Sequence, residues 1–159
     1  MTPAQLTTLK AAIAAETDVA FVAFRLGGST GSMAEWYSLP DPAFVVWKTN
    51  VSVNSVGDNM VGTEFAGLTS LNATRLQTIA QYSPSGINPS MADRRQFFDD
   101  VFSGAGGVLT RAKLLILWKR MALRGEKLYA TGTGTDTTPA TLAFEGRITN
   151  SDVLQALAS

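Results

Sequence analysis

Few side chains in this 159-residue sequence have the types and spacing that catalysis needs. Two carboxylates stand side by side at Asp99 and Asp100, and paired carboxylates act as acid and base only when they face each other across a cleft. Neighbours on a helix point about 100° apart, so the pair predicts a solvated helix face shared with Arg94 and Arg95. The chain has no histidine and no cysteine, which excludes zinc fingers, thiol nucleophiles and Ser-His-Asp catalysis. We therefore expect no enzyme and no cofactor.

A second candidate is the stretch GGSTGS at residues 27–32, whose backbone N–H groups could cradle an anion at the start of a helix. It lacks the Gly-Lys-Ser/Thr ending of a phosphate-binding loop. The stretch therefore predicts a plain turn, followed by a short helix with Ser32 and Glu35 as its capping box.

Basic residues gather late in the chain, where six of the thirteen lie between residues 111 and 127. One interpretation is a basic strip that faces nucleic acid or an acidic partner. The other is that these cations collect near a helix C-terminus, where the helix dipole favours them, and solvate the ends of a buried helix. The rotation of about 100° per residue along a helix would place these side chains on different sides of it, and the net charge of the chain is zero. We therefore favour the second interpretation. The members of the strip would be Arg111, Lys113, Lys119, Arg120 and Arg124.

A Thr/Gly tract, TGTGTDTTP, lies inside the stretch from Lys127 to Gly146, between two segments that alternate polar and apolar residues like strands. The tract is too long for a two-residue turn, so it predicts a long-tipped hairpin or a pair of extended arms. Two interpretations stay open: a disordered loop tip, or an arm that pairs its backbone with a neighbouring subunit. In the second, the portal or subunit contacts would be Lys127, Tyr129, Thr131, Thr133, Thr135, Leu142 and Phe144.

The remaining patterns are mainly helical. Capping signals and apolar periodicity predict helices near residues 2–16, 18–26, 53–60, 69–82, 89–102, 109–124 and 149–158, with extended backbone in AFVVWK. Thr2 and Gln5 would form a capping box at the start of the first helix. The helix near 69–82 would have an apolar stripe of Leu71, Leu76, Ile79 and Ala80, and the helix near 89–102 an aromatic face of Phe97, Phe98, Val101 and Phe102. The run from Leu114 to Trp118 has few polar directions, so its helix is expected to be central and mostly surrounded. The predicted fold is a mainly α, small helical bundle in residues 1–126. Residues 127–159 would add a long C-terminal hairpin or extended arm and a final short helix.

The composition points to an assembly. Charged residues make up 16% of the chain, against about 25% in ordinary soluble domains. A surface so poor in charge is more stable against other subunits than alone in water. The longest charge-free apolar run is far shorter than the roughly 20 residues of a membrane span, and no secretion signal is visible. We therefore expect a protein made in a cytosol, without membrane contact.

Three stretches resemble proteins encoded in the virion-structure gene clusters of tailed bacteriophages and prophages. They are MTPAQLTTLKAAIAAE, FVVWKTNVSV, and RGEKLYATGTGTDTTPATLAFEG followed by ITNSDV, which is the most specific. The spacing of these blocks extends the resemblance over most of the chain, from Met1 to Leu157. Within that setting, a mainly helical protein of this size with an extended C-terminal piece resembles a head-to-tail connector, or adaptor.

The resemblance implies a structural protein of the virion neck, between capsid and tail, assembled in the host bacterial cytoplasm. Its partners would be the portal protein and neighbouring neck or tail proteins. The chain would form a homo-oligomeric ring, a dodecamer, with packaged DNA passing through the channel without sequence-specific binding. Residues 124–159 would grip the portal or a neighbouring adaptor. One departure is that adaptor channels are often lined with acidic residues, and this chain has no obvious acidic strip.

Two other functions remain open. A capsid decoration or minor head protein would explain the low charge equally well. A small helical nucleic-acid-binding protein would use the basic residues from Arg111 to Lys127, and its affinity would fall steeply with salt.

Overall fold

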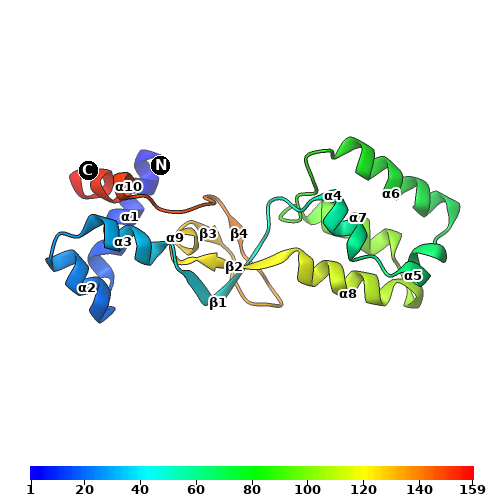
Figure 1. The fold of residues 1–159 in the computed structure, drawn as a ribbon, viewed down its shortest axis with the longest axis horizontal. Helices are drawn as coiled ribbons and strands as arrows, with labels where there is room; N and C mark the ends of the chain where they lie inside the picture. The colour runs from blue at the N-terminus through cyan, green and yellow to red at the C-terminus, as the bar shows by residue number, and fades with distance from the viewer. The chain divides into compact units, whose positions relative to one another are not determined.

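A computed structural model describes residues 1–159, and it is mainly α-helical, as the sequence predicts (Figure 1). The chain forms two compact units. Unit 1 comprises Met1–Val46 and Met121–Ser159, and unit 2 comprises Trp47–Arg120. This division differs from the boundary expected at residue 126, because the C-terminal residues pack with the N-terminal helices.

Unit 1 contains most of the short strands and the helices at both ends of the chain. Its helices are α1 (Pro3–Ala15), α2 (Val19–Leu26), α3 (Thr30–Tyr37), α9 (Arg124–Lys127) and α10 (Asn150–Ala158). The strands are β1 (Pro40–Trp47), β2 (Lys119–Leu123), β3 (Ala130–Thr131) and β4 (Thr141–Leu142). Strand β1 pairs with β2, and β3 pairs with β4 in antiparallel register. The unit boundaries fall inside β1 and β2.

The core of unit 1 joins the two ends of the chain. Leu9 and Ile13 of α1 are buried against Val153 and Ala156 of α10. The Thr2 hydroxyl and the Gln5 side chain form the predicted capping box of α1. Thr149 and Asp152 form a second capping box, which begins α10. The fold of unit 1 therefore depends on residues from both ends of the sequence.

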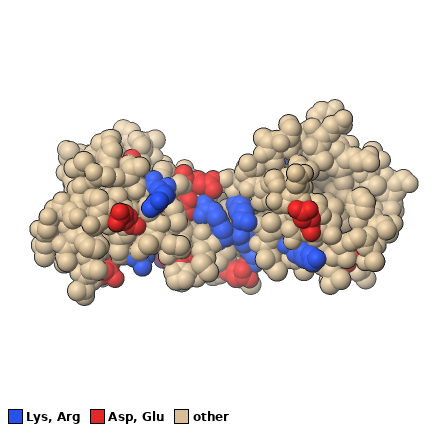
Figure 2. Space-filling view, viewed as in Figure 1, with Lys and Arg blue, Asp and Glu red and all other residues tan.

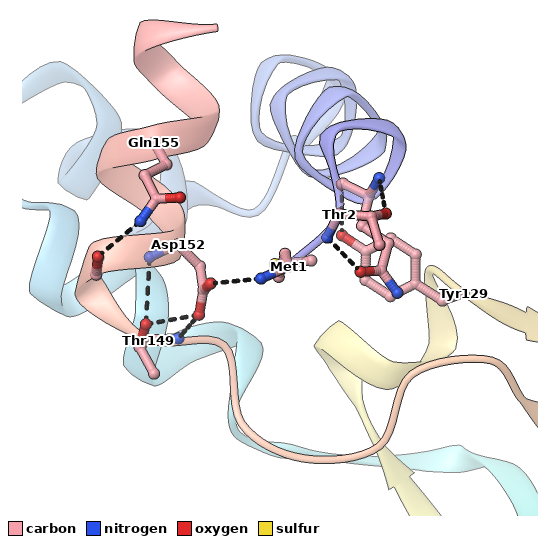
Figure 3. Close-up of polar contacts among 8 residues, drawn as sticks. Met1, Thr2, Tyr129, Thr149, Asp152 and Gln155 are labelled. Carbon is pink, nitrogen blue, oxygen red and sulfur yellow. Dashed lines mark hydrogen bonds and ion pairs between the residues drawn. The ribbon is translucent and has the colours of Figure 1, made fainter.

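Figure 3 shows how polar contacts support this packing. The Met1 ammonium lies 3.6 Å from Oδ1 of Asp152, and the Tyr129 hydroxyl donates to the Gln5 carbonyl at 2.9 Å. Burial alone would raise the pKa of Asp152. Hydrogen bonds from the hydroxyl and backbone N–H of Thr149, together with the ammonium, outweigh burial and hold that pKa below its ordinary value.

Replacing Asp152 with Asn should lower the free energy of unfolding by about 1 kcal/mol at pH 7, because the ion pair with the Met1 ammonium and the charge-assisted hydrogen bonds from Thr149 are lost. A carboxylate with a depressed pKa stabilises the fold above the unfolded-state pKa of about 4, and this contribution disappears as the pH falls through the folded-state pKa. Urea unfolding should therefore give a constant difference from about pH 5 to 7 that shrinks below about pH 4. The exposed Asp58→Asn variant serves as control, and a difference that grows on acidification would contradict this assignment.

Unit 2 is helical and has its own core. Its elements are α4 (Val53–Asp58), α5 (Gly62–Ala66), α6 (Ser70–Tyr82), α7 (Ala92–Val101), the short 3-10 helix η1 (Ala105–Gly107) and α8 (Val108–Leu117). The predicted aromatic face of α7 is confirmed, since Phe98, Val101 and Phe102 are buried there with Leu114 and Trp118. Glu64 anchors the start of α8, where its carboxylate accepts from the backbone N–H of Leu109 at 3.0 Å and of Thr110 at 2.7 Å.

Two expectations about residues 109–124 are wrong. The helix ends at Leu117, and KRMAL forms strand β2, because pairing with β1 overrides the local helix propensity. Helix α8 is also not surrounded, since only Thr110 and Leu114 within it are buried while Leu109, Leu115 and Ile116 are exposed. A continuous apolar run therefore marks a surface helix here.

Smaller corrections concern helix starts and faces. Ser32 lies inside α3, whose N-cap is Ser29, so the expected Ser32–Glu35 capping box is absent. Helix α7 begins later than predicted, with Met91 as its N-cap, because the Asn88 side chain accepts from the Ser90 backbone instead. On α6, Leu71 was expected on the buried stripe and is exposed.

The Thr/Gly tract is a packed loop rather than a long hairpin or extended arm. Strands β3 and β4 have two residues each, and the tract between them lies along β1. The Val45 N–H donates to the Gly134 carbonyl at 2.7 Å, and the Ala140 N–H donates to the Val45 carbonyl at 3.0 Å. Ala140 is completely buried with Val46 and Ala122. In the single chain, therefore, the tract is neither a disordered tip nor an arm.

Candidate functional site

The predicted contact residues of the C-terminal segment mostly bind other parts of unit 1. Lys127 forms an ion pair of 2.7 Å with Asp41 and lies over the Phe44 ring. This hydrogen bond from Lys127 is the main cause that holds the pKa of Asp41 below its ordinary value. The rings of Tyr129 and Phe144 pack edge to face, with centroids 5.5 Å apart.

The remaining members of that set are also engaged. The hydroxyls of Thr133 and Thr135 each lie 2.6 Å from the Thr138 hydroxyl, and Leu142 packs against the small core of Val46, Ala122 and Ala140. Thr131 is exposed and pairs with Thr141 through the short sheet. These contacts within unit 1 consequently stabilise the loop.

Glu126 is a central residue that the sequence analysis missed. Its side chain is 1% exposed, and its carboxylate accepts from the backbone N–H of Leu123 at 2.8 Å and of Gly146 at 2.9 Å. Gly125 beside it has no room for a side chain, because a Cβ there would meet Ile148. The sequence block RGEK…FEG contained this residue, and the hydrogen bond between Glu126 and Gly146 joins the two ends of the block.

The residues of the expected basic strip are divided between different elements. Arg111 and Lys113 lie on α8, Lys119 and Arg120 on β2, and Arg124 on α9. Arg124 lies over the Trp36 ring at 4.1 Å, and Lys113 is exposed. On the face drawn in Figure 2, most of the surface is uncharged and acidic atoms lie beside basic ones. The structure does not join these residues into one continuous helical strip.

A cleft of about 450 Å³ in unit 1 contains charges of both signs. Asp41, Lys127 and Arg124 line it together with Glu16 and Trp36. Tyr37 also lines it, and its buried hydroxyl has no hydrogen-bond partner. Burial, followed by the nearby Glu16 carboxylate, raises the pKa of this Tyr37 hydroxyl. Because the cations already contact Asp41 and Trp36, the cleft offers no single charge preference to a ligand.

A second pocket, of about 280 Å³, lies in unit 2 and has aromatic walls. Arg95 lies over the Trp47 ring at 4.1 Å, and its Nη1 donates to the carbonyls of Pro89 at 2.6 Å and Ser90 at 3.1 Å. Trp118 lines the pocket, and its buried Nε1 has no hydrogen-bond partner. The rest of the lining is Asp99, Arg111, Ala112 and Leu115.

The adjacent carboxylates have separate surroundings, as predicted for neighbours on a helix. Asp99 lines the unit 2 pocket, whereas Asp100 accepts from the Gln96 side chain at 2.8 Å. Burial raises the pKa of Asp99, although Arg111 and Arg95 oppose this effect. The two carboxylates do not face each other as a catalytic pair would.

The outer face of α8 is apolar and uncovered. It is defined here as the contiguous set Val108, Leu109, Ala112, Leu115 and Ile116, all of which are exposed. The spacing of three and four residues places these side chains on one side of the helix. The basic residues Arg111 and Lys113 border this face. Soluble monomers rarely leave such a face in water unless it binds something.

Helix α2 has a similar outer face in unit 1. Val19, Ala20, Ala23 and Leu26 are exposed at helical spacing, while Phe21 is buried on the opposite side. Asp18 caps the start of this helix and Glu16 precedes it, so the face begins beside two acidic residues. An uncovered apolar helix face is therefore present in each unit.

Comparisons with family models, curated proteins and solved structures find no match for this chain. None of its helices combines the length and hydropathy required to cross a membrane. No group of three or more acidic residues is placed to hold a metal ion.

Proposed function

We propose that this protein is a structural subunit of a tailed-phage virion, a head-to-tail adaptor that assembles as a homo-oligomeric ring on the portal. The observation that carries the proposal is the outer face of α8, a contiguous apolar surface on a helix whose opposite side is fixed in the core. Burying one side chain of this size stabilises an interface by about 1.5–3 kcal/mol. Such a face suits a chain that works by association.

The second face supports a ring. A subunit that repeats head to tail needs two different complementary surfaces, and such contacts produce closed rings when the rotation closes. The α2 face begins beside acidic residues and the α8 face is bordered by basic ones. The phage setting itself is supported by the resemblance of the three sequence blocks.

Ile116→Asp should abolish assembly and leave the isolated chain folded. Ile116 is 72% exposed, so the change costs at most about 0.5 kcal/mol of folding stability. In an interface the buried charge would weaken association by at least 100-fold, equivalent to about 2.7 kcal/mol. Sedimentation velocity of the chain mixed with portal rings measures the effect.

Leu71→Asp is the matched control, because Leu71 is 69% exposed and lies on α6. It should assemble like the wild type. Equal behaviour of the two variants would exclude the α8 face as the interface.

Imaging of complete virions tests the function itself. An adaptor predicts density for this chain at one vertex, beneath the portal. Density spread over the shell would favour a decoration protein, and absence from purified particles would overturn the proposal. Tight, salt-sensitive binding to DNA by the isolated chain would instead favour the nucleic-acid-binding function.

A further inference from the structure

The unit 2 pocket has more hydrogen-bond donors than acceptors. The guanidinium-bearing side chains of Arg95 and Arg111 line it, and Asp99 is the only anionic side chain in the lining. The guanidinium of Arg111 donates through Nη1 to the carbonyls of Phe102 and Gly104, and that of Arg95 uses Nη1 as well. A guanidinium has five N–H donors, so each arginine keeps donors beyond these contacts.

The pocket also has a defined size and an apolar edge. Its volume of about 280 Å³ lies below the range of about 300–1,000 Å³ that is usual for sites of small-molecule ligands. Ala112 and Leu115 line the pocket and belong to the outer face of α8. The pocket therefore has room for one polar side chain of a partner. Residues next to that side chain would contact the apolar face of α8.

We propose that this pocket receives the carboxylate of an acidic side chain from a protein partner, while an adjacent apolar residue of the partner packs on Ala112 and Leu115. Guanidinium groups bind carboxylates through charge-assisted, often bidentate, hydrogen bonds. This inference rests on the proposed function only for the identity of the partner, since the chemistry of the pocket stands on its own residues.

A protein carboxylate fits this pocket better than a nucleic-acid backbone. Binding to DNA requires a series of cations along the phosphates, whereas this pocket is a single enclosure with aromatic walls. Asp99 would also repel a polyanion. A lone carboxylate needs only the local excess of one positive charge, from two arginines and one aspartate.

The test is a titration with the peptide acetyl-Gly-Glu-Leu-amide, followed by the indole N–H resonances in nuclear magnetic resonance. Trp47 and Trp118 lie in the pocket and Trp36 lies in unit 1, which makes Trp36 an internal control. We expect saturable shifts at Trp47 and Trp118 only. The matched peptide with Gln in place of Glu should bind at least tenfold more weakly, because the charge is lost.

Three variants sharpen the test. Ala112→Leu narrows the pocket at an exposed position and should lower the affinity for the Glu peptide at least tenfold. Asp99→Asn removes the carboxylate that repels the ligand, and it should increase the affinity for the Glu peptide several-fold. Lys113→Gln changes the charge of α8 outside the pocket and should alter the affinity by less than twofold.

Several results would overturn the inference. They are equal binding of the Glu and Gln peptides, no saturation by either, no effect of Ala112→Leu, or tighter binding of inorganic phosphate or a DNA duplex than of the Glu peptide. Failure of the proposed function is distinguishable: the Glu peptide would still bind in the pocket although the chain is missing from virions. Saturable binding of a second copy of the chain, blocked by Ala112→Leu, would identify the acidic partner as that copy.

Discussion

Replacing Glu126 with Gln lowers the free energy of unfolding of this protein by about 3 kcal/mol in our account. The carboxylate is buried and accepts two backbone N–H groups, from Leu123 and Gly146. Hydrogen bonds to a charged group contribute about 1.5–3 kcal/mol each, and an amide NH₂ would place a donor against one of these donors. Urea unfolding at pH 7 measures the change.

Glu35→Gln is the control for that experiment, since Glu35 is an exposed glutamate of unit 1 on α3. It should change the unfolding free energy by no more than about 0.5 kcal/mol. A loss for Glu126→Gln as small as that of the control would show that the carboxylate does not organise the C-terminal segment.

The second large effect is expected at Gly134, where the Thr/Gly tract meets β1. Its φ of +67° is unfavourable for other residues, and a Cβ there would overlap the Phe44 ring. Gly134→Ala should therefore cost about 3 kcal/mol, of which about 1–2 kcal/mol is backbone strain and the rest is overpacking. The measurement is again the free energy of unfolding.

Gly28→Ala separates the two causes. Gly28 has almost the same φ, +66°, but nothing lies within 4 Å of its added Cβ. This variant should lose only the backbone term, about 1–2 kcal/mol. Phe44→Ala in the Gly134→Ala background should then cost less than Phe44→Ala alone, because the overlap is gone. Additive effects of the pair would contradict the close packing of the tract on β1.

These predictions change how the most specific block of the sequence is interpreted. For the stretch RGEKLYATGTGTDTTPATLAFEG the sequence left two interpretations open, a disordered loop tip or an arm that contacts another subunit. In the structure, Glu126 accepts a hydrogen bond from Gly146, Gly134 packs on Phe44, and Lys127 pairs with Asp41. The residues that carry the resemblance therefore describe how unit 1 folds, and the proposed interface lies on α8.

Local signals were sufficient where a helix begins with a capping box. The start of α1 at Thr2, the start of α10 at Thr149 and the buried aromatic face of α7 all follow from short-range patterns. The mainly α fold could be predicted for the same reason.

Long-range contacts explain what the sequence did not reveal. Strand β2 has a helical pattern in the sequence, and its pairing partner, β1, lies more than seventy residues earlier. The role of Glu126 depends on a backbone N–H twenty residues away, at Gly146. The run from Leu114 to Trp118 is apolar, and an apolar run is compatible both with a helix buried in the core and with a helix whose outer face is exposed. The sequence pattern therefore could not show which of these two positions the helix has.

Binding to isolated portal rings tests the central claim most directly. Native mass spectrometry of the wild-type chain mixed with portal rings from the phage proposed to encode it should detect a ring of this chain on each portal, and Ile116→Asp should remove it. A wild-type chain that stays monomeric and unbound in that mixture would contradict the account.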